Sequence, residues 1–217
     1  ALGRWNYLMK YWVKTPRFVP YVFSELVWRF SPTKPNIYLT FDDGPSGLVT
    51  EHILTILEKE NIKATFFCVG KNVLKQPDLY KKILTNGHSV GNHSMTHPNG
   101  WKVKSSIYQN DINKAINVIN SNLFRPPFGK LNIRSLKSLK KTFQIIMWDV
   151  VGGDFDFKLS SNKVISNVVD NARNGSVIVI HDNDNLKALT LSSLLPIIKA
   201  LKEKGFCFKP IPFSPLV

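Results

Sequence analysis

The sequence predicts a single-domain α/β fold, a distorted (β/α) barrel of about seven units. Its 217 residues, of which 43% are hydrophobic, suit one domain with a substantial core. Short β-branched runs alternate with amphipathic helical segments, a pattern typical of parallel strands joined by helical crossovers. Each cluster of potentially catalytic residues directly follows a predicted strand, where α/β folds build their sites. Seven units in a chain of this length favour an incomplete or distorted barrel over an open sheet.

The predicted strands are rich in Val, Ile and Phe, and span residues 37–41, 64–69, 88–92, 123–125, 144–148, 176–180 and 206–209. The predicted helices carry apolar residues at helical spacing, and span residues 50–60, 78–86, 105–120, 133–141, 162–172 and 189–203. Gly87 and Gly175 follow two of these helices, as C-terminal caps often do. Residues 149–157 are predicted to form a loop rich in Gly and Asp.

Residues 1–34 differ in composition from the rest of the chain because aromatic residues are interleaved with basic ones. We expect this segment to pack on or flank the catalytic domain, residues 35–217; an interfacial membrane anchor is the alternative. The segment lacks the apolar core and small-residue cleavage site of a secretory signal. No apolar run approaches ~18 residues, so no transmembrane helix is expected.

The chain carries a net charge of +14, which favours binding to polyanions such as nucleic acid, anionic lipid or an acidic wall polymer. No glycine-rich phosphate loop and no base-stacking motif is present, so nucleic acid is not an expected partner. Cys68 and Cys207 lie in apolar runs and are expected to be buried free thiols. The absence of a Cys-x-x-Cys motif excludes a thiolate zinc site.

The stretch Thr-Phe-Asp-Asp-Gly-Pro ends the first predicted strand with two adjacent carboxylates, Asp42 and Asp43. Asp, Gly and Pro are also ordinary turn residues, so a solvated turn is the alternative to a metal or acid–base centre. The second cluster contains His93 and His97, which are four residues apart and are predicted to share one face of a helical turn. Two imidazoles with one carboxylate form a typical ligand set for a catalytic divalent metal.

Three further clusters follow later strands. Arg125 begins Arg-Pro-Pro-Phe-Gly and is expected to pair with a carboxylate. A loop with Asp149, Asp154 and Asp156 follows the fifth strand. His181 ends an otherwise apolar strand, where either a catalytic residue or a hydrogen-bonded core histidine would fit.

In this order, the five clusters resemble those of the polysaccharide deacetylases, carbohydrate esterases with a NodB-like domain. The resemblance extends from about residue 37 to residue 210. It implies a distorted (β/α) barrel and one divalent metal ion, zinc first, with cobalt or nickel as alternatives. It also implies hydrolysis of acetamide groups on N-acetylglucosamine-containing glycans, peptidoglycan or chitin-like, with release of acetate. Peptidoglycan is placed ahead of chitin because of the net positive charge of the protein, since a basic surface attracts an anionic wall glycan but not neutral chitin.

The resemblance also implies a role for each matching residue. The metal ligands would be Asp43, His93 and His97. Asp42 would be the general base, held by Arg125, and His181 would be the general acid, oriented by Asp154. The backbone N–H of Phe128 would stabilise the oxyanion. The chain departs from the family pattern at two motifs. Val151 and Phe155 replace the first Asp and the Trp of the usual Asp-x-x-Asp-Trp, which leaves open which aspartate pairs with His181. Phe128 stands where Tyr is common, so the groove would be less polar.

Other function classes fit less well. A glycosidase needs two carboxylates ~5–9.5 Å apart across a bond, whereas Asp42 and Asp43 are adjacent. A metal phosphodiesterase would need more carboxylates for a second metal ion. An O-deacetylase of acetylated xylan and a non-catalytic glycan-binding relic remain as alternatives. A monomer is favoured. The substrate class indicates the cell envelope as the location, and the cytoplasm is the alternative. Association with an anionic cell wall or membrane surface is a further option.

Overall fold

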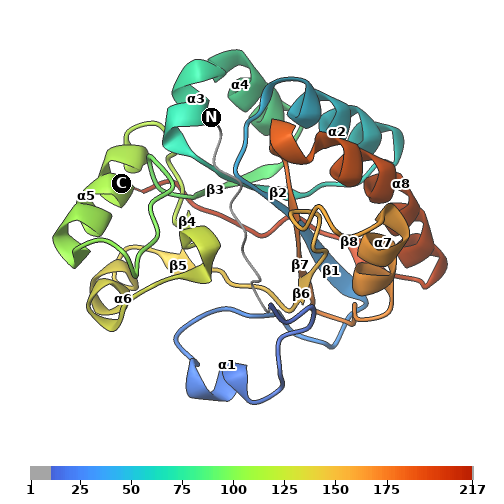
Figure 1. Cartoon of the computed structure of the whole chain (residues 1–217), viewed down its shortest axis with the longest axis horizontal. Helices are drawn as coiled ribbons and strands as arrows, with labels where there is room; N and C mark the ends of the chain where they lie inside the picture. The colour runs from blue at the N-terminus through green and yellow to red at the C-terminus, as the bar shows by residue number, and fades with distance from the viewer. Residues whose placement is uncertain (1–10, 217) are drawn as a thin grey trace.

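The computed structural model describes residues 11–216 as one α/β domain (Figure 1). Its strands are β1 (Asn36–Asp42), β2 (Thr65–Cys68), β3 (Ser89–Asn92), β4 (Leu123–Phe124), β5 (Gln144–Ile145), β6 (Val150–Val151), β7 (Val177–His181) and β8 (Cys207–Phe208). The α-helices are α1 (Val19–Val22), α2 (Gly47–Lys59), α3 (Gly70–Lys75), α4 (Pro77–Thr85), α5 (Ser105–Ile116), α6 (Ile133–Leu139), α7 (Ser161–Val169) and α8 (Lys187–Glu203). Short 3₁₀ turns lie at Pro127–Gly129 and Asp184–Leu186.

The strands form one parallel sheet in the order β5-β4-β3-β2-β1-β7-β6, and β8 pairs with β1. Because every pairing is parallel, the carboxyl ends of the strands meet at one edge of the sheet. Helices surround this curved sheet in Figure 1. The predicted fold class, a distorted (β/α) barrel in a single domain, is confirmed.

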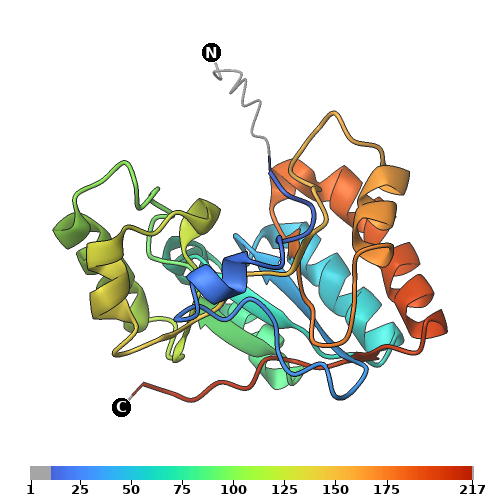
Figure 2. The same cartoon turned by 90° about the horizontal axis from the view of Figure 1, so that it is seen from below.

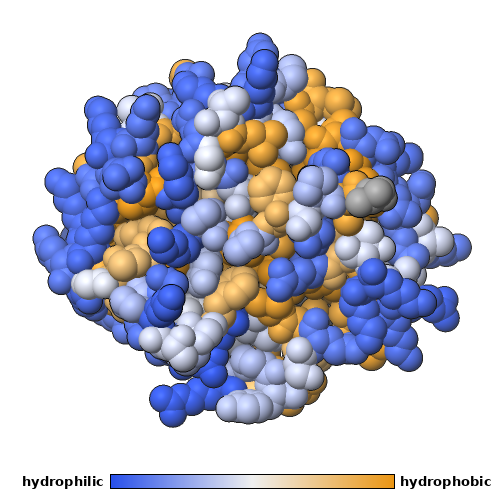
Figure 3. Space-filling view, turned by 180° about the vertical axis from the view of Figure 1, so that it is seen from behind, coloured by the Kyte–Doolittle hydropathy of each residue, from blue (hydrophilic) through white to orange (hydrophobic). Residues whose placement is uncertain are grey.

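The central strands are buried because both faces of a parallel sheet are covered. Ile37, Leu39 and Phe41 of β1 are fully buried. The main core cluster joins them to apolar residues of α2, α7 and α8. Hydrophilic side chains cover much of the molecular surface seen in Figure 3, with smaller hydrophobic patches between them.

The strands β5 and β6 lie at the two ends of the sheet order, and residues 11–30 run between them. Lys14 pairs antiparallel with Val150, and Val27 pairs parallel with Ile146. The N–H of Val27 donates to the carbonyl of Ile145 at 2.9 Å. Figure 2 shows α1 between the side of the molecule that carries α6 and the side that carries α7 and α8. The division of the chain into residues 1–34 and a catalytic domain stays a prediction. Residues 1–10 of the first segment lie outside the described residues.

Several predicted elements differ in extent from the observed ones. The fifth strand ends at Ile145, and β6 lies inside the stretch predicted as a loop, because Val150 and Val151 pair with β7. The short helices α1 and α3 were not predicted. The expectation that both cysteines are buried is wrong for Cys207, which is exposed, since the two-residue strand β8 lies off the main path of the sheet. No helix among the described residues has the length and apolarity needed to cross a bilayer.

Candidate active site

Asp42, the last residue of β1, forms a buried ion pair with Arg125, which follows β4. Nη1 of Arg125 donates to Oδ1 of Asp42 at 2.7 Å, and also to the hydroxyl of Thr40 at 2.7 Å. The other guanidinium nitrogens donate to main-chain carbonyls, Nε to Ile146 at 3.1 Å and Nη2 to Met147 at 3.0 Å. Arg125 has no exposed surface. Burial lowers its pKa from the usual arginine range, and Asp42 opposes that shift. The carboxylate is therefore held in one position by a fixed, charge-assisted bond.

Asp43, His93 and His97 bring one ligand atom each to within 4.8 Å of one another. Oδ1 of Asp43 lies 3.1 Å from Nε2 of His97 and 3.6 Å from Nε2 of His93. Burial raises the pKa of Asp43, but the hydrogen bond with His97 and the charges that His181, His97 and His93 carry at acid pH outweigh it and hold this pKa well below its usual range. The carboxylate therefore stays ionised.

The segment that joins the two histidines is not the helical turn predicted from their spacing. Ser94 has a φ of 67° and His97 a φ of 60°, so the chain bends twice through the left-handed region. Asp111 of α5 stabilises this bend, because its side chain accepts the N–H groups of Met95 at 2.9 Å and Thr96 at 3.0 Å. The imidazole rings still meet, with centroids 4.9 Å apart. The prediction of a helical turn is wrong because tertiary hydrogen bonds, and not helical periodicity, bring the histidines together.

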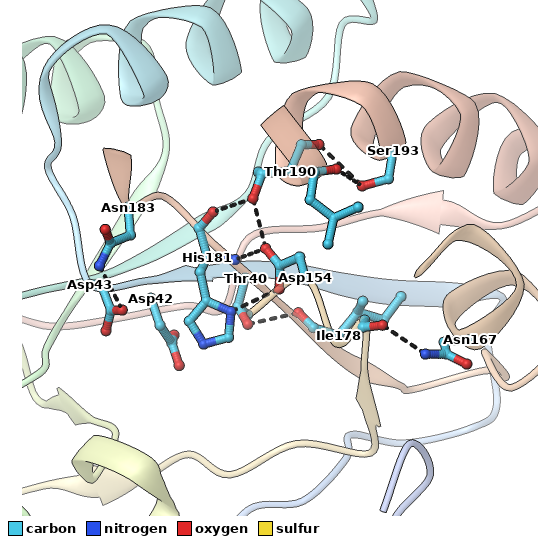
Figure 4. Close-up of polar contacts among 12 residues, drawn as sticks. Thr40, Asp42, Asp43, Asp154, Asn167, Ile178, His181, Asn183, Thr190 and Ser193 are labelled. Carbon is cyan, nitrogen blue, oxygen red and sulfur yellow. Dashed lines mark hydrogen bonds and ion pairs between the residues drawn. The ribbon is translucent and has the colours of Figure 1, made fainter. Parts of the chain in front are cut away.

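His181 ends β7 directly opposite Asp42 in the parallel register of β1 and β7. Figure 4 shows the two side chains projecting to the same side of the sheet, with Asp43 close by. Nδ1 of His181 lies 2.9 Å from Oδ1 of Asp154, and the N–H of His181 donates to Oδ2 of Asp154 at 2.8 Å. Burial lowers the pKa of His181, but the charge and hydrogen bond of Asp154, with Asp43 and Asp42, raise it to about 10.

The structure distinguishes the three aspartates of the loop after β5. Asp154 is fully buried against His181 and also accepts the hydroxyl of Thr190 at 2.8 Å. Asp149 instead binds Arg173, whose Nη2 lies 2.6 Å from its Oδ1. Asp156 accepts the N–H of Lys158 in an exposed turn. Of the three, Asp154 is the one that contacts His181.

Phe128 lies at the centre of the 3₁₀ turn after Arg125, with a φ of 59° and a half-exposed ring. Its ring meets His97 edge-on at 4.6 Å between centroids. On the opposite side of the site, the ring of Phe155 lies 5.3 Å from that of His181. Tyr11 packs on Phe155 at 4.8 Å, so the segment before β1 reaches the edge of the site.

Two acidic residues that support the site were not singled out from the sequence. Asp182 is buried, and its oxygens accept the N–H of Gly44 and the hydroxyl of Thr50, each at 2.8 Å. It thereby ties the turn after Asp43 to β7 and α2. The available signal was its position directly after His181 in the sequence. Asp111 gave no comparable signal, because it is one of several polar residues on an amphipathic helix.

The donor set fits a divalent metal ion. Nδ1 of His93 lies 2.8 Å from the carbonyl oxygen of Arg125. That contact assigns the proton to Nδ1 and leaves the lone pair of Nε2 facing Asp43. Burial lowers the pKa of His93 to about 4, so the imidazole is neutral at physiological pH, as a ligand must be. Two imidazoles and one carboxylate match the three-ligand set of catalytic zinc sites.

Comparisons with known proteins identify the family to which the chain belongs. The sequence model of the polysaccharide deacetylase family matches residues 30–143. A peptidoglycan-N-acetylglucosamine deacetylase of Bacillus cereus is 37% identical over 189 residues, covering 82% of this chain and 68% of the relative. A chitooligosaccharide deacetylase of Azorhizobium caulinodans is 30% identical, covering 85% of this chain and 96% of the relative. The crystal structure of the Bc1960 peptidoglycan N-acetylglucosamine deacetylase superposes with a TM-score of 0.84 at 34% identity, covering 91% of this chain and 95% of that one. The chain belongs to the polysaccharide deacetylase family.

Proposed function

We propose that this protein is a metal-dependent N-deacetylase that removes acetyl groups from N-acetylglucosamine residues of a glycan, with peptidoglycan ahead of chitin. The observation that carries the proposal is the position of two hydrogen-bonded carboxylate pairs beside the cluster of Asp43, His93 and His97. Asp42 with Arg125, and His181 with Asp154, both adjoin Asp43. Amide hydrolysis needs a base for water, an acid for the leaving amine and an electrophile for the oxyanion.

In this mechanism Asp43, His93 and His97 hold the metal ion. When bound, the ion would polarise the acetamide carbonyl and lower the pKa of water. Asp42 accepts a proton from the attacking water, and Arg125 keeps the carboxylate in place. The backbone N–H of Phe128 donates to the developing oxyanion.

His181 then donates a proton to the nitrogen of the departing amine. A pKa raised to about 10 keeps this imidazole protonated at neutral pH, as a general acid requires. The charge of a bound metal ion would lower that pKa. Asp154 fixes the orientation of the ring through both its side-chain and main-chain contacts.

The choice of substrate rests on the relatives and on charge. The matched relatives are named for peptidoglycan N-acetylglucosamine and chitooligosaccharide deacetylation. The net charge of +14 would concentrate the protein on an anionic wall polymer, whereas neutral chitin would gain nothing from it. The anionic substrate is therefore expected to react faster at low ionic strength, with salt reducing the difference.

The test is acetate release from peptidoglycan, chitooligosaccharides and acetylated xylan, at low and high salt, with Asp42→Asn as the inactive control. We expect peptidoglycan to react fastest at low salt. A preference for acetylated xylan would replace the proposal with an O-deacetylase. No release from any of the three by the metal-loaded protein would favour the non-catalytic glycan-binding alternative. Equal, salt-insensitive rates on chitin and peptidoglycan would remove the electrostatic argument but not the chemistry.

A further inference from the structure

The first part of the described chain exposes an unusual group of large side chains. Trp12, Phe18, Tyr21, Val22 and Phe23, here called the aromatic patch, have exposed fractions from 50% for Phe23 to 77% for Tyr21. Trp12 and Phe18 are in edge-to-face contact, with centroids 6.5 Å apart. Contiguous exposed apolar side chains of this size typically mark an interaction surface.

The local backbone presents the patch outward. Helix α1 is only four residues long, and Val19 is its one buried residue. The backbone here forms a tight turn, with Pro20 at the start of the helix. The N–H of Tyr21 donates to the carbonyl of Phe18 at 3.0 Å, and the N–H of Phe23 donates to the carbonyl of Val19 at 2.9 Å. Figure 1 shows α1 at the edge of the molecule, apart from the helices that pack on the sheet. The turn therefore holds the aromatic rings without covering them.

The charge around the patch restricts what can bind to it. Residues 11–24 contain Lys14 and Arg17 but no acidic residue. Both side chains are exposed, and within residues 11–216 neither has an ion-pair partner. Aromatic residues with a basic margin are the composition of surfaces that lie in the headgroup layer of an anionic bilayer.

We propose that the aromatic patch docks the protein on an anionic lipid bilayer. The rings of Trp12, Phe18, Tyr21 and Phe23 enter the interface, while Lys14 and Arg17 contact the lipid phosphates. A second copy of the chain is a poorer occupant, because a symmetric contact would bring both basic margins together in two molecules that each carry +14. None of the catalytic residues lies in the patch. The proposal does not depend on the deacetylase chemistry.

The test is co-sedimentation of the metal-loaded protein with vesicles of phosphatidylcholine alone and of phosphatidylcholine mixed with phosphatidylglycerol. We expect binding to the mixed vesicles and little binding to the neutral ones. Replacing Phe18, Tyr21 and Phe23 together by Ser should weaken binding at least about tenfold. The matched control replaces the exposed Leu74, Leu84 and Ile107 by Ser and should bind like the parent.

A second pair of variants tests the charges. Lys14→Glu/Arg17→Glu should also lose about tenfold in affinity, whereas Lys75→Glu/Lys81→Glu, with the same change in net charge, should lose less. Equal losses in the two charge variants would mean that net charge alone carries binding, and would overturn the proposal. So would unchanged binding of the triple aromatic variant, absence of binding to both vesicles, or a solution dimer that the triple variant abolishes.

Discussion

Asp154 contacts His181 twice, with Oδ1 2.9 Å from the imidazole Nδ1 and Oδ2 2.8 Å from the main-chain nitrogen. One carboxylate thus fixes both the ring and the strand end that carries it. The negative charge favours the protonated imidazole, and this contributes to the raised pKa of His181.

Asp154→Asn should therefore lower the pKa of His181 and slow deacetylation by roughly 10²–10⁴-fold, the usual contribution of a positioned acid. The pKa can be followed by NMR titration of the imidazole in the metal-free protein, where it should fall from about 10. The matched control is Asp149→Asn, because Asp149 binds Arg173 and not His181. If Asp149→Asn moves the titration of His181 and Asp154→Asn does not, the pairing is misassigned.

The adjacent acids Asp42 and Asp43 should respond differently to the same substitution. Asp42→Asn should keep about one zinc ion per chain and lose turnover, because Asp42 is bound by Arg125 and is not in the ligand set. Asp43→Asn should lose the metal, because it removes the carboxylate shared by both histidines. Metal content by mass spectrometry and acetate release separate the two. Full activity in excess chelator, with no metal detected, would refute metal dependence itself.

Arg125 is expected to be essential for stability as well as for positioning Asp42. Arg125→Met leaves the buried Asp42 carboxylate without its counter-charge, and should lower the free energy of unfolding by roughly 3–5 kcal/mol. Urea denaturation measures this change. The control is Arg134→Met, which removes an exposed arginine and should change stability by less than about 0.5 kcal/mol. Equal effects of the two substitutions would show that the buried pair is unimportant for folding.

Gly44 should not tolerate a side chain. An added Cβ would overlap the carboxylate of Asp182, whose oxygens lie at 1.9 Å and 2.4 Å from its position. Gly44→Ala should therefore displace the turn after Asp43, lower the unfolding midpoint and weaken metal binding. Gly205→Ala is the comparison, because no atom lies within 4 Å of its Cβ and only the left-handed φ of +81° costs energy, about 1–2 kcal/mol. A Gly44→Ala protein with normal metal affinity would show that Asp182 can move aside.

His88 is expected to make stability depend on pH. Its Nδ1 accepts the N–H of Ala64 at 3.2 Å, and burial, helped by Lys63, lowers its pKa to about 4. The unfolded chain therefore takes up a proton near pH 6.5 while the folded protein does not. Stability contributed by the neutral ring is complete above pH 6.5 and is lost as the pH falls toward 4, by up to roughly 3 kcal/mol. Urea denaturation of the metal-free protein from neutral to acid pH should show a smaller loss for His88→Asn, and identical pH dependence would exclude this role.

The sequence by itself determined the fold class and the composition of the candidate site. Strand and helix periodicities are local properties, so alternating segments predicted parallel strands whose carboxyl ends share an edge. Residues that directly end strands, such as Asp42 and His181, were placed correctly at that edge, because strand register alone sets them side by side. The two-residue strand β6 was missed, since a pairing of that length has almost no sequence signal.

The tertiary structure decided which groups meet across long separations in the chain. The choice of Asp154 over Asp149 and Asp156 depends on which carboxylate the folded chain brings to His181. Three similar carboxylates within eight residues of sequence do not indicate which one it is. The bend between His93 and His97 depends on Asp111 of another element. The path of residues 11–30 between β5 and β6 depends on backbone hydrogen bonds, which nearly every residue type except proline can donate. Each of these contacts follows from the order and packing of the strands, which the spacing of residues along the chain does not predict.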